Sequence, residues 1–168
     1  ESLDLQTMVR AANDPNGRPV MVQLRAVQAA FPLYGEVRLS DGTKYSHELL
    51  RARGVLVQPG LLQQANLQVG DTLKIGSLTF TIRGVMQHLP GSAMQFGPLQ
   101  RVLVDQADAV AAGLTGFGSR VQYDWFFKTH EGQDAALLKS LGEELRTTRL
   151  GWLGSYRNQE DWMTRVLG

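Results

Sequence analysis

Three histidines are the residues of this chain best suited to bind a metal or move a proton. His47-Glu48 begins like the helix of a zinc protease, but that motif needs a second histidine at position 51, which is Arg51 here. His88 and His130 lie in loop-like sequence, without another ligand at metal-binding spacing. We therefore predict no metal site, and we expect all three histidines to be solvated at the surface.

The sequence gives equally little support for nucleophilic or acid–base catalysis. A serine hydrolase carries its nucleophile in Gly-x-Ser-x-Gly at a strand-to-helix turn, whereas residues 116–120 read Gly-Phe-Gly-Ser-Arg and precede a predicted strand. Asp105 and Asp108 could form a carboxylate pair, but an N-cap and a first-turn acid of one predicted helix explain them better. The phosphate-binding loop of nucleotide hydrolases is absent. The sequence thus predicts no catalytic residue and no cofactor.

One long segment could bind a partner instead. Residues 86–100 contain two prolines and two glycines without a steady hydrophobic period, so we predict a loop of unusual length. Its Met94, Phe96 and Leu99 are adaptable apolar side chains that can contact a partner or a hydrophobic cargo. The alternative is that the loop folds back and buries them.

Composition narrows the class of protein. The 168 residues carry 17 Lys and Arg against 16 Asp and Glu, without the basic stripe of a nucleic-acid-binding protein. The absence of cysteine excludes a disulfide framework, a thiol nucleophile and a Cys-ligated metal. No apolar run approaches the roughly 20 residues of a membrane span. Eighteen glycines and six prolines favour many short elements joined by turns over a helical bundle.

The hydrophobic periodicity predicts a mixture of strands and short helices. Two hairpins are expected, one from 3–9 and 20–27 and a second from 72–75 and 78–85 around the turn Gly76-Ser77. Further strands are expected at residues 36–39, 55–57, 101–104 and 120–128. Helices are expected at residues 59–66, 105–112 and 133–146 and from 158 onward, with one helical turn within 45–54.

Six stretches in this order carry a resemblance to a known family. They are Phe31-Pro32-Leu33-Tyr34-Gly35-Glu36-Val37, then Val55 to Leu62, Val69 to Leu73, Phe80 to Val85, Arg101 to Val104 and Gly118 to Val121. Together they resemble the first extracytoplasmic domain of FtsX/MacB-type ABC transporter permeases. Within that family the YbbP-like branch, kin to the lipoprotein-releasing LolC and LolE subunits, is the most similar.

The resemblance implies an α+β fold with two lobes, the MacB-like periplasmic core. Residues 1–30 and 115–168 would form a mixed α/β lobe near the membrane that lacks an N-terminal strand and helix, and residues 31–114 would form a β-rich outer lobe. It further implies a periplasmic domain of an inner-membrane protein, without catalytic residues. A separate cytoplasmic ATPase would supply motion, and the outer surface would engage hydrophobic or lipid-like cargo, a chaperone, or an esterase or lysophospholipase.

Two other classes of function stay open at the level of sequence. A small lipid-type hydrolase would need a serine or an aspartate beside a histidine in a pocket, with His47 and His130 as the candidates. A structural oligomerisation module would instead expose a strand edge that pairs with another copy.

Overall fold

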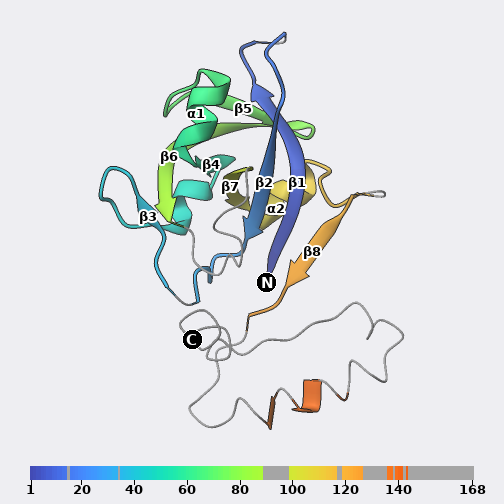
Figure 1. Cartoon of the computed structure of the whole chain (residues 1–168). Helices are drawn as coiled ribbons and strands as arrows, with labels where there is room; N and C mark the ends of the chain where they lie inside the picture. The colour runs from blue at the N-terminus through green and yellow to red at the C-terminus, as the bar shows by residue number, and fades with distance from the viewer. Residues whose placement is uncertain are drawn as a thin grey trace, which may run out of the picture. The chain divides into compact units, whose positions relative to one another are not determined.

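The computed structural model describes residues 1–14, 16–33, 35–88, 99–116, 119–126, 136, 137, 139–141 and 143. The chain divides into two compact units, Glu1–Phe126 and Phe127–Gly168 (Figure 1). The described residues of the second unit are helical and fall within the helix predicted at 133–146, whereas the helix predicted from residue 158 lies outside the described residues. Among the described residues, no helix has the length and apolarity needed to cross a membrane.

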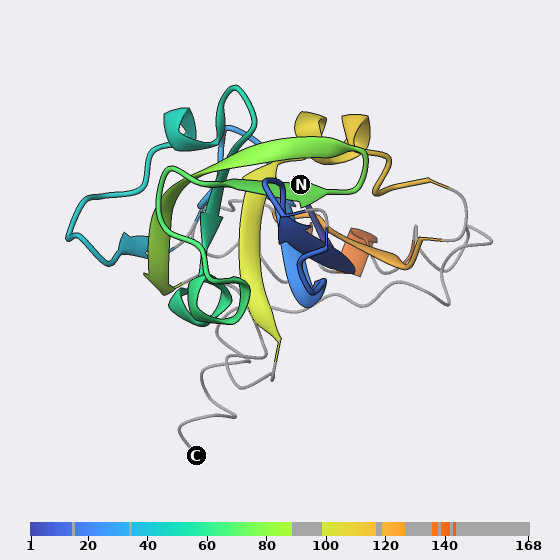
Figure 2. The ribbon, with the colours of Figure 1, turned by 90° about the horizontal axis from the view of Figure 1, so that it is seen from above.

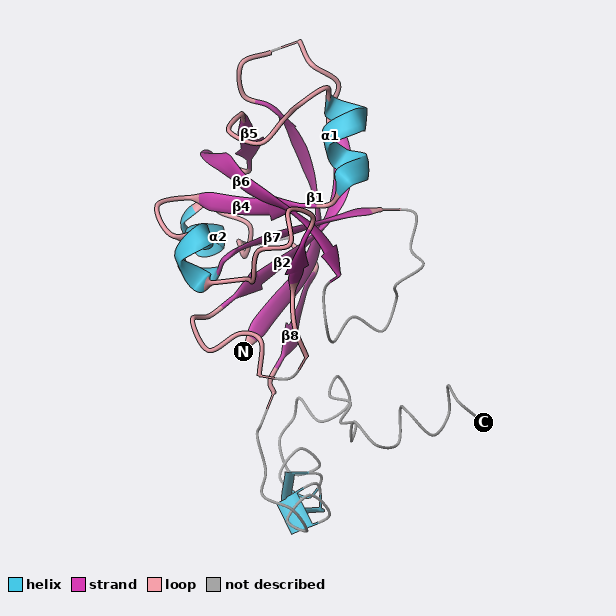
Figure 3. Ribbon diagram, turned by 90° about the vertical axis from the view of Figure 1, so that its left-hand side faces the viewer, coloured by secondary structure: helices cyan, strands magenta, loops and turns pink. Residues whose placement is uncertain are grey.

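The first unit consists mainly of strands. They are β1 (Ser2–Ala11), β2 (Val20–Val27), β3 (Arg38–Leu39), β4 (Gly54–Val57), β5 (Thr72–Ile75), β6 (Leu78–His88), β7 (Gln100–Asp105) and β8 (Val121–Asp124). The helical elements are the short 3-10 helix η1 (His47–Leu50), α1 (Pro59–Ala65) and α2 (Gln106–Ala111). Figure 3 shows α1 and α2 on different sides of the strands.

Six of the described strands close into a ring. Antiparallel β1 and β2 form the long first hairpin, β2 pairs parallel with β7, and β7 pairs antiparallel with β4. From β4 the ring continues through parallel β6 and antiparallel β5, which returns to the last residues of β1 (Figure 2). Strand β8 pairs with the first residues of β1, on the edge that β5 occupies farther along. The result is a small barrel with β8 attached outside the ring.

Alternation of side chains fills the inside of this barrel. Every second residue of a strand points to the same face, so one set of apolar residues from each ring strand faces inward. Leu24, Phe80 and Leu73 belong to this core and are fully buried. A second, smaller cluster lies on the opposite face of the strands and is formed by Val27, Val37, Leu39, Leu50, Leu56, Met86 and Leu103.

Local sequence explains where these elements begin and end. Pro59 occupies the first turn of α1, where no amide hydrogen is needed, and Asn66 ends the helix in the left-handed region with φ 52°. The β5–β6 hairpin turns at Gly76, whose φ is 57°. A side chain at Gly76 would collide with the carbonyl oxygen of Ala112, while the amide of Ser77 donates to that same oxygen at 3.0 Å. The second hairpin is thereby fixed to the end of α2.

The structure confirms both predicted hairpins and corrects the predicted loop at 86–100. Strand β6 runs on to His88, because Met86 and His88 pair with β3 and Met86 is buried in the smaller cluster. Strand β7 already begins at Gln100, which pairs with Val22 of β2. The predicted lobes, 1–30 with 115–168 against 31–114, stay a prediction. The parallel pairing of β2 with β7 joins a strand of the predicted lobe 1–30 to a strand of the predicted lobe 31–114.

Candidate functional site

His47 lies at the start of η1 and is held between two partners. Its Nε2 is 2.7 Å from Oδ2 of Asp105, and its Nδ1 is 3.2 Å from the hydroxyl of Tyr45. The side chain of His47 is 16% exposed, so the prediction of a solvated surface histidine was wrong. The reason is tertiary, since Asp105 stands 58 residues away in the chain.

Asp105 serves two elements with one carboxylate. Its Oδ1 accepts the amide hydrogen of Ala107 at 2.8 Å, which confirms it as the N-cap of α2. Its Oδ2 faces His47 at the same time. Asp108, expected to be a solvated first-turn acid, accepts the backbone amide of Arg53 at 3.2 Å. The acids of this helix therefore connect α2 to the segment around η1.

Tyr45 lies against the second ring nitrogen of His47. Burial, followed by the charge of Asp105, raises the pKa of the Tyr45 phenol well above its usual range, so the phenol stays protonated. The phenol hydroxyl lies 3.2 Å from Nδ1, opposite the nitrogen that faces Asp105. Phe31 packs edge-on against Tyr45 with ring centres 5.9 Å apart. Both nitrogens of His47 thus lie within hydrogen-bonding distance of side chains of this domain, Tyr45 and Asp105.

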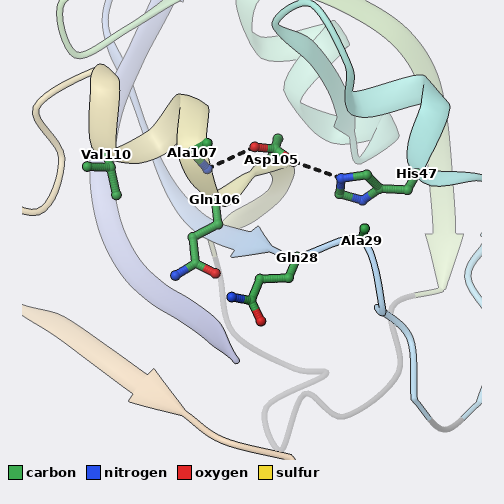
Figure 4. A pocket seen from close by; sticks show the side chains of 7 residues that line it. All are labelled: Gln28, Ala29, His47, Asp105, Gln106, Ala107 and Val110. Atoms are coloured by element: carbon green, nitrogen blue, oxygen red, sulfur yellow. Dashed lines mark hydrogen bonds and ion pairs between the residues drawn. The ribbon is translucent and has the colours of Figure 1, made fainter.

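An open depression of about 530 Å³ lies beside this pair (Figure 4). It is lined by Gln28, Ala29, His47, Asp105, Gln106, Ala107 and Val110. None of these is a serine, threonine or cysteine, and the described residues hold no cluster of three or more metal-ligating side chains. The arrangement can orient a small group by hydrogen bonds, but it lacks the nucleophile that acyl transfer requires.

A buried group of charges lies on the outward side of β1, β2 and β7. Arg25 holds the carboxylate of Asp4 with its Nε at 3.0 and 3.1 Å and its Nη2 at 2.7 Å, and these residues are directly opposite in the β1–β2 hairpin. Arg101 is also buried, and burial together with the charge of Arg25 lowers its pKa. Burial raises the pKa of Asp4; Arg25 opposes this shift and Asp124 adds to it.

The predicted cargo residues are only partly covered by the structure. Met94 and Phe96 lie outside the described residues, and Leu99 is half-buried just before β7. The described residues include another apolar surface: Tyr123 and Trp125 are exposed and stack on each other at 6.0 Å, followed by Phe126. The alternation of residues 121–127 predicts that Tyr123 and Trp125 share one face of the strand. Whether that face is buried or exposed depends on the tertiary structure.

Comparison with known proteins assigns the family. The family model of the MacB-like periplasmic core domain matches residues 3–143, which is most of the chain. The chain belongs to this family. The MacB-like periplasmic core domain described here is 31% identical over 137 residues to the uncharacterized ABC transporter permease YbbP of Escherichia coli. That match covers 79% of this chain and 16% of the permease, so the chain spans about a sixth of its relative's length.

Two solved structures are similar to this chain, and the first of them supports the same fold. A domain assigned to a permease protein of Porphyromonas gingivalis matches with a TM-score of 0.50 at 18% identity, covering 84% of this chain and 62% of that one. The periplasmic region of MacB from Actinobacillus actinomycetemcomitans matches with a TM-score of 0.48 at 14% identity, covering 88% and 66%.

These comparisons confirm several expectations from the sequence. The resemblance to FtsX/MacB-type permeases and its YbbP-like branch is confirmed, as are the mixed α and β class and the periplasmic location in an inner-membrane permease. This MacB-like domain is therefore the periplasmic domain of an ABC transporter permease.

Proposed function

We propose that this domain works without catalysis, by binding a periplasmic partner or a hydrophobic cargo and by transmitting motion that a separate cytoplasmic ATPase drives. Membership of the MacB-like family supports the link to an ATPase, through the membrane part of the same transporter. As its periplasmic partner or cargo we propose an esterase, a lysophospholipase, a chaperone or a lipid-like molecule, which is what the resemblance to the YbbP-like branch implies. No nucleic acid is involved in this proposal.

The closed barrel is the observation that carries the mechanical part. An open sheet can flex along its edges, whereas a ring filled by a close-packed core resists deformation and moves as a body. A displacement applied at one strand is then delivered to the strand on the opposite side. The binding part rests on Met94, Phe96 and Leu99, which we propose as the contact with partner or cargo.

Distance measurements in the intact permease, assembled with its ATPase, test the mechanical part. This domain contains no cysteine, so pairs of introduced cysteines can carry spin labels at chosen positions. The pair Asn66→Cys and Lys139→Cys reports on the two compact units, and its distance should change on ATP binding and hydrolysis. An ATPase variant that binds but cannot hydrolyse ATP is the control. An unchanged distance through the whole cycle contradicts the proposal.

A second labelled pair distinguishes the two ways of dividing the chain. Asn13→Cys and Asn66→Cys belong to different lobes in the predicted division, but both lie in the unit Glu1–Phe126. If the barrel moves as one body, their distance stays constant through the cycle. If it changes together with the first pair, residues 1–30 and 31–114 are separate moving parts.

Binding is tested with a lysophospholipid below its micelle concentration, added to the purified domain. Met94→Ser combined with Phe96→Ser should weaken binding about tenfold or more, since two apolar contacts are lost. Val69→Ser is the matched control, because Val69 is 53% exposed and lies in a different segment. Equal binding by the double variant and by the control removes these residues from the proposed contact.

The hydrolase alternative has one observation in its favour, the contact of Asp105 with His47 at the edge of a depression. A hydrolase of this kind would lose its turnover when His47 is replaced. We expect the purified domain to cleave p-nitrophenyl esters no faster than its His47→Ala variant. Turnover that disappears in His47→Ala would establish catalysis instead of binding.

A further inference from the structure

Two methionines face each other on the outward side of the first hairpin. Met8 of β1 is directly opposite Met21 of β2, and the two residues are 50% and 46% exposed (Figure 1). The amide of Ala12 donates to Thr72 of β5, so the backbone groups of every second residue before it, Met8 included, also point to that side and not to β2. Met8 and Met21 therefore form a pair without backbone hydrogen bonds between them, the kind whose side chains lie closest. Their thioether chains present one apolar surface to solvent.

Two positive charges stand next to this apolar surface. Arg10 follows Met8 on the same face of β1 and is directly opposite Lys74 of β5, which is exposed. Like charges on directly opposite residues of a sheet repel each other, and an anion beside them removes that repulsion. The neighbouring positions on this face of the described strands are uncharged and are Gln6, Gln23 and Thr79.

An apolar pair beside a basic pair matches a ligand that is apolar at one end and negatively charged at the other. We propose that Met8, Met21, Arg10 and Lys74 form a docking surface for a single-chain anionic phospholipid, with its acyl chain along the methionines and its phosphate at the basic pair. A free anion would leave the thioethers in water, and a purely apolar ligand would leave the two positive charges without a counter-charge from the ligand. The inference rests on the proposed function, because it names a lipid class and a place for the lipid-like cargo.

The two halves of this surface contribute differently to binding. Apolar area that leaves water supplies affinity roughly in proportion to its size, and methionine side chains adapt their shape to an acyl chain. Exposed charges contribute little affinity in water, but they distinguish an anionic headgroup from one without net charge. Loss of the methionines should therefore reduce affinity for every single-chain phospholipid, and loss of Lys74 should mainly reduce the preference for the anionic one.

Nuclear magnetic resonance of isotope-labelled methionine methyl groups in the 168-residue chain locates the contact. The protein is titrated with lysophosphatidylglycerol below its micelle concentration, and separately with lysophosphatidylcholine of the same acyl chain length. We expect the signals of Met8 and Met21 to shift together, whereas that of Met86, which is 1% exposed, stays in place as the internal control. The anionic lipid should bind about fivefold more tightly than the zwitterionic one. Glycerol phosphate, which lacks the acyl chain, should leave the signals of Met8 and Met21 in place.

Three variants separate the apolar half from the charged half. Met8→Gln combined with Met21→Gln should weaken binding of the anionic lipid about tenfold. Lys74→Gln should weaken it about threefold and remove most of the preference over the zwitterionic lipid. Leu33→Gln is the matched control, because Leu33 is 37% exposed and lies outside these strands, and it should bind like the parent protein.

The possible failures are distinguishable. If the lipid shifts the signal of Met94 and leaves those of Met8 and Met21 unchanged, the lipid binds elsewhere, and this inference is overturned while the proposed function stands. Equal affinity of the double methionine variant and of Leu33→Gln has the same meaning. If the parent protein binds neither phospholipid, this docking surface and the lipid-like cargo of the proposed function are both overturned.

Discussion

At the scale of single residues, the most informative contact is His47 with Asp105. It joins η1 to the start of α2, and both side chains are mostly buried, at 16% and 23% exposed. With Tyr45 on the other nitrogen, the three side chains satisfy one another. The two contacts hold the imidazole in place and connect the segment around η1 to α2. This contact supports a structural role for the one Asp–His pair that hydrogen-bonds in the described part of the chain.

Replacing either residue of this pair with alanine should destabilise the folded domain. His47→Ala leaves a buried carboxylate oxygen and a buried phenol without their partner, which should lower the free energy of unfolding by about 1–3 kcal/mol. Asp105→Ala should cost about 1 kcal/mol more, because it also removes the cap of α2. Urea denaturation measures both values. Glu48→Ala removes an exposed ion pair with Arg51 and should change stability by less than about 1 kcal/mol; a similar loss in all three variants would contradict this view.

At the scale of elements, the turns are the points where the sequence is least replaceable. The β5–β6 turn is fixed from outside, since the carbonyl oxygen of Ala112 accepts the amide of Ser77 in the space where a Gly76 side chain would have to lie. The turn at Gly42 has a similar left-handed backbone, φ 79°, but nothing lies within 4 Å of the position that a Cβ atom would take there. Comparison of the two glycines therefore distinguishes the cost of a left-handed backbone from the cost of a steric collision.

The matched pair Gly76→Ala and Gly42→Ala tests this distinction. Both variants place a side chain at positive φ, which costs about 1–2 kcal/mol. Gly76→Ala must also displace the end of α2 or the hairpin, so we expect its loss of stability to exceed that of Gly42→Ala by at least about 1 kcal/mol. Thermal or chemical unfolding measures the difference. Equal losses would mean that α2 moves away from the hairpin at no cost.

At the scale of the whole molecule, the closed ring gives the first unit one continuous core. Residues from all six ring strands pack inside it, so loss of one large inner side chain affects strands that are distant in sequence. On β8, Val121 packs against this core, whereas Tyr123 is 47% exposed. We therefore expect stability to be concentrated in the ring, with β8 contributing less to it.

The variants Phe80→Ala and Tyr123→Ala test whether stability is concentrated in the ring. The first removes a fully buried aromatic ring from the core and should cost about 3–5 kcal/mol, with protection against hydrogen exchange reduced in the β1–β2 and β4–β6 pairs together. The second should cost less than about 1 kcal/mol and reduce protection mainly in β8. A Phe80 variant that loosens only the β5–β6 hairpin would argue against a single closed core.

Much of the fold could be predicted from the sequence because its determinants are local. Alternating apolar residues predicted β1, β2, β5 and β6, and Gly76-Ser77 predicted the second hairpin. Pro59, Asn66 and Asp105 marked helix ends with their own side chains or backbone preferences. The pairing of Asp4 with Arg25 was not predicted, although the register of the first hairpin, which places them opposite each other, is a signal that could have found it.

What only the tertiary structure decided depends on residues far apart in the chain. Alternation fixes which side chains share a face of a strand, but it is the same for an open sheet and for a ring, so the closure from β2 through β7 to β1 could not be predicted from it. Likewise, no local pattern brings His47 to Asp105 or Arg101 beside Arg25, because the two partners of each pair are far apart in the chain. The sequence by itself determined the elements and the family, and the long-range pairings decided which charges are buried together.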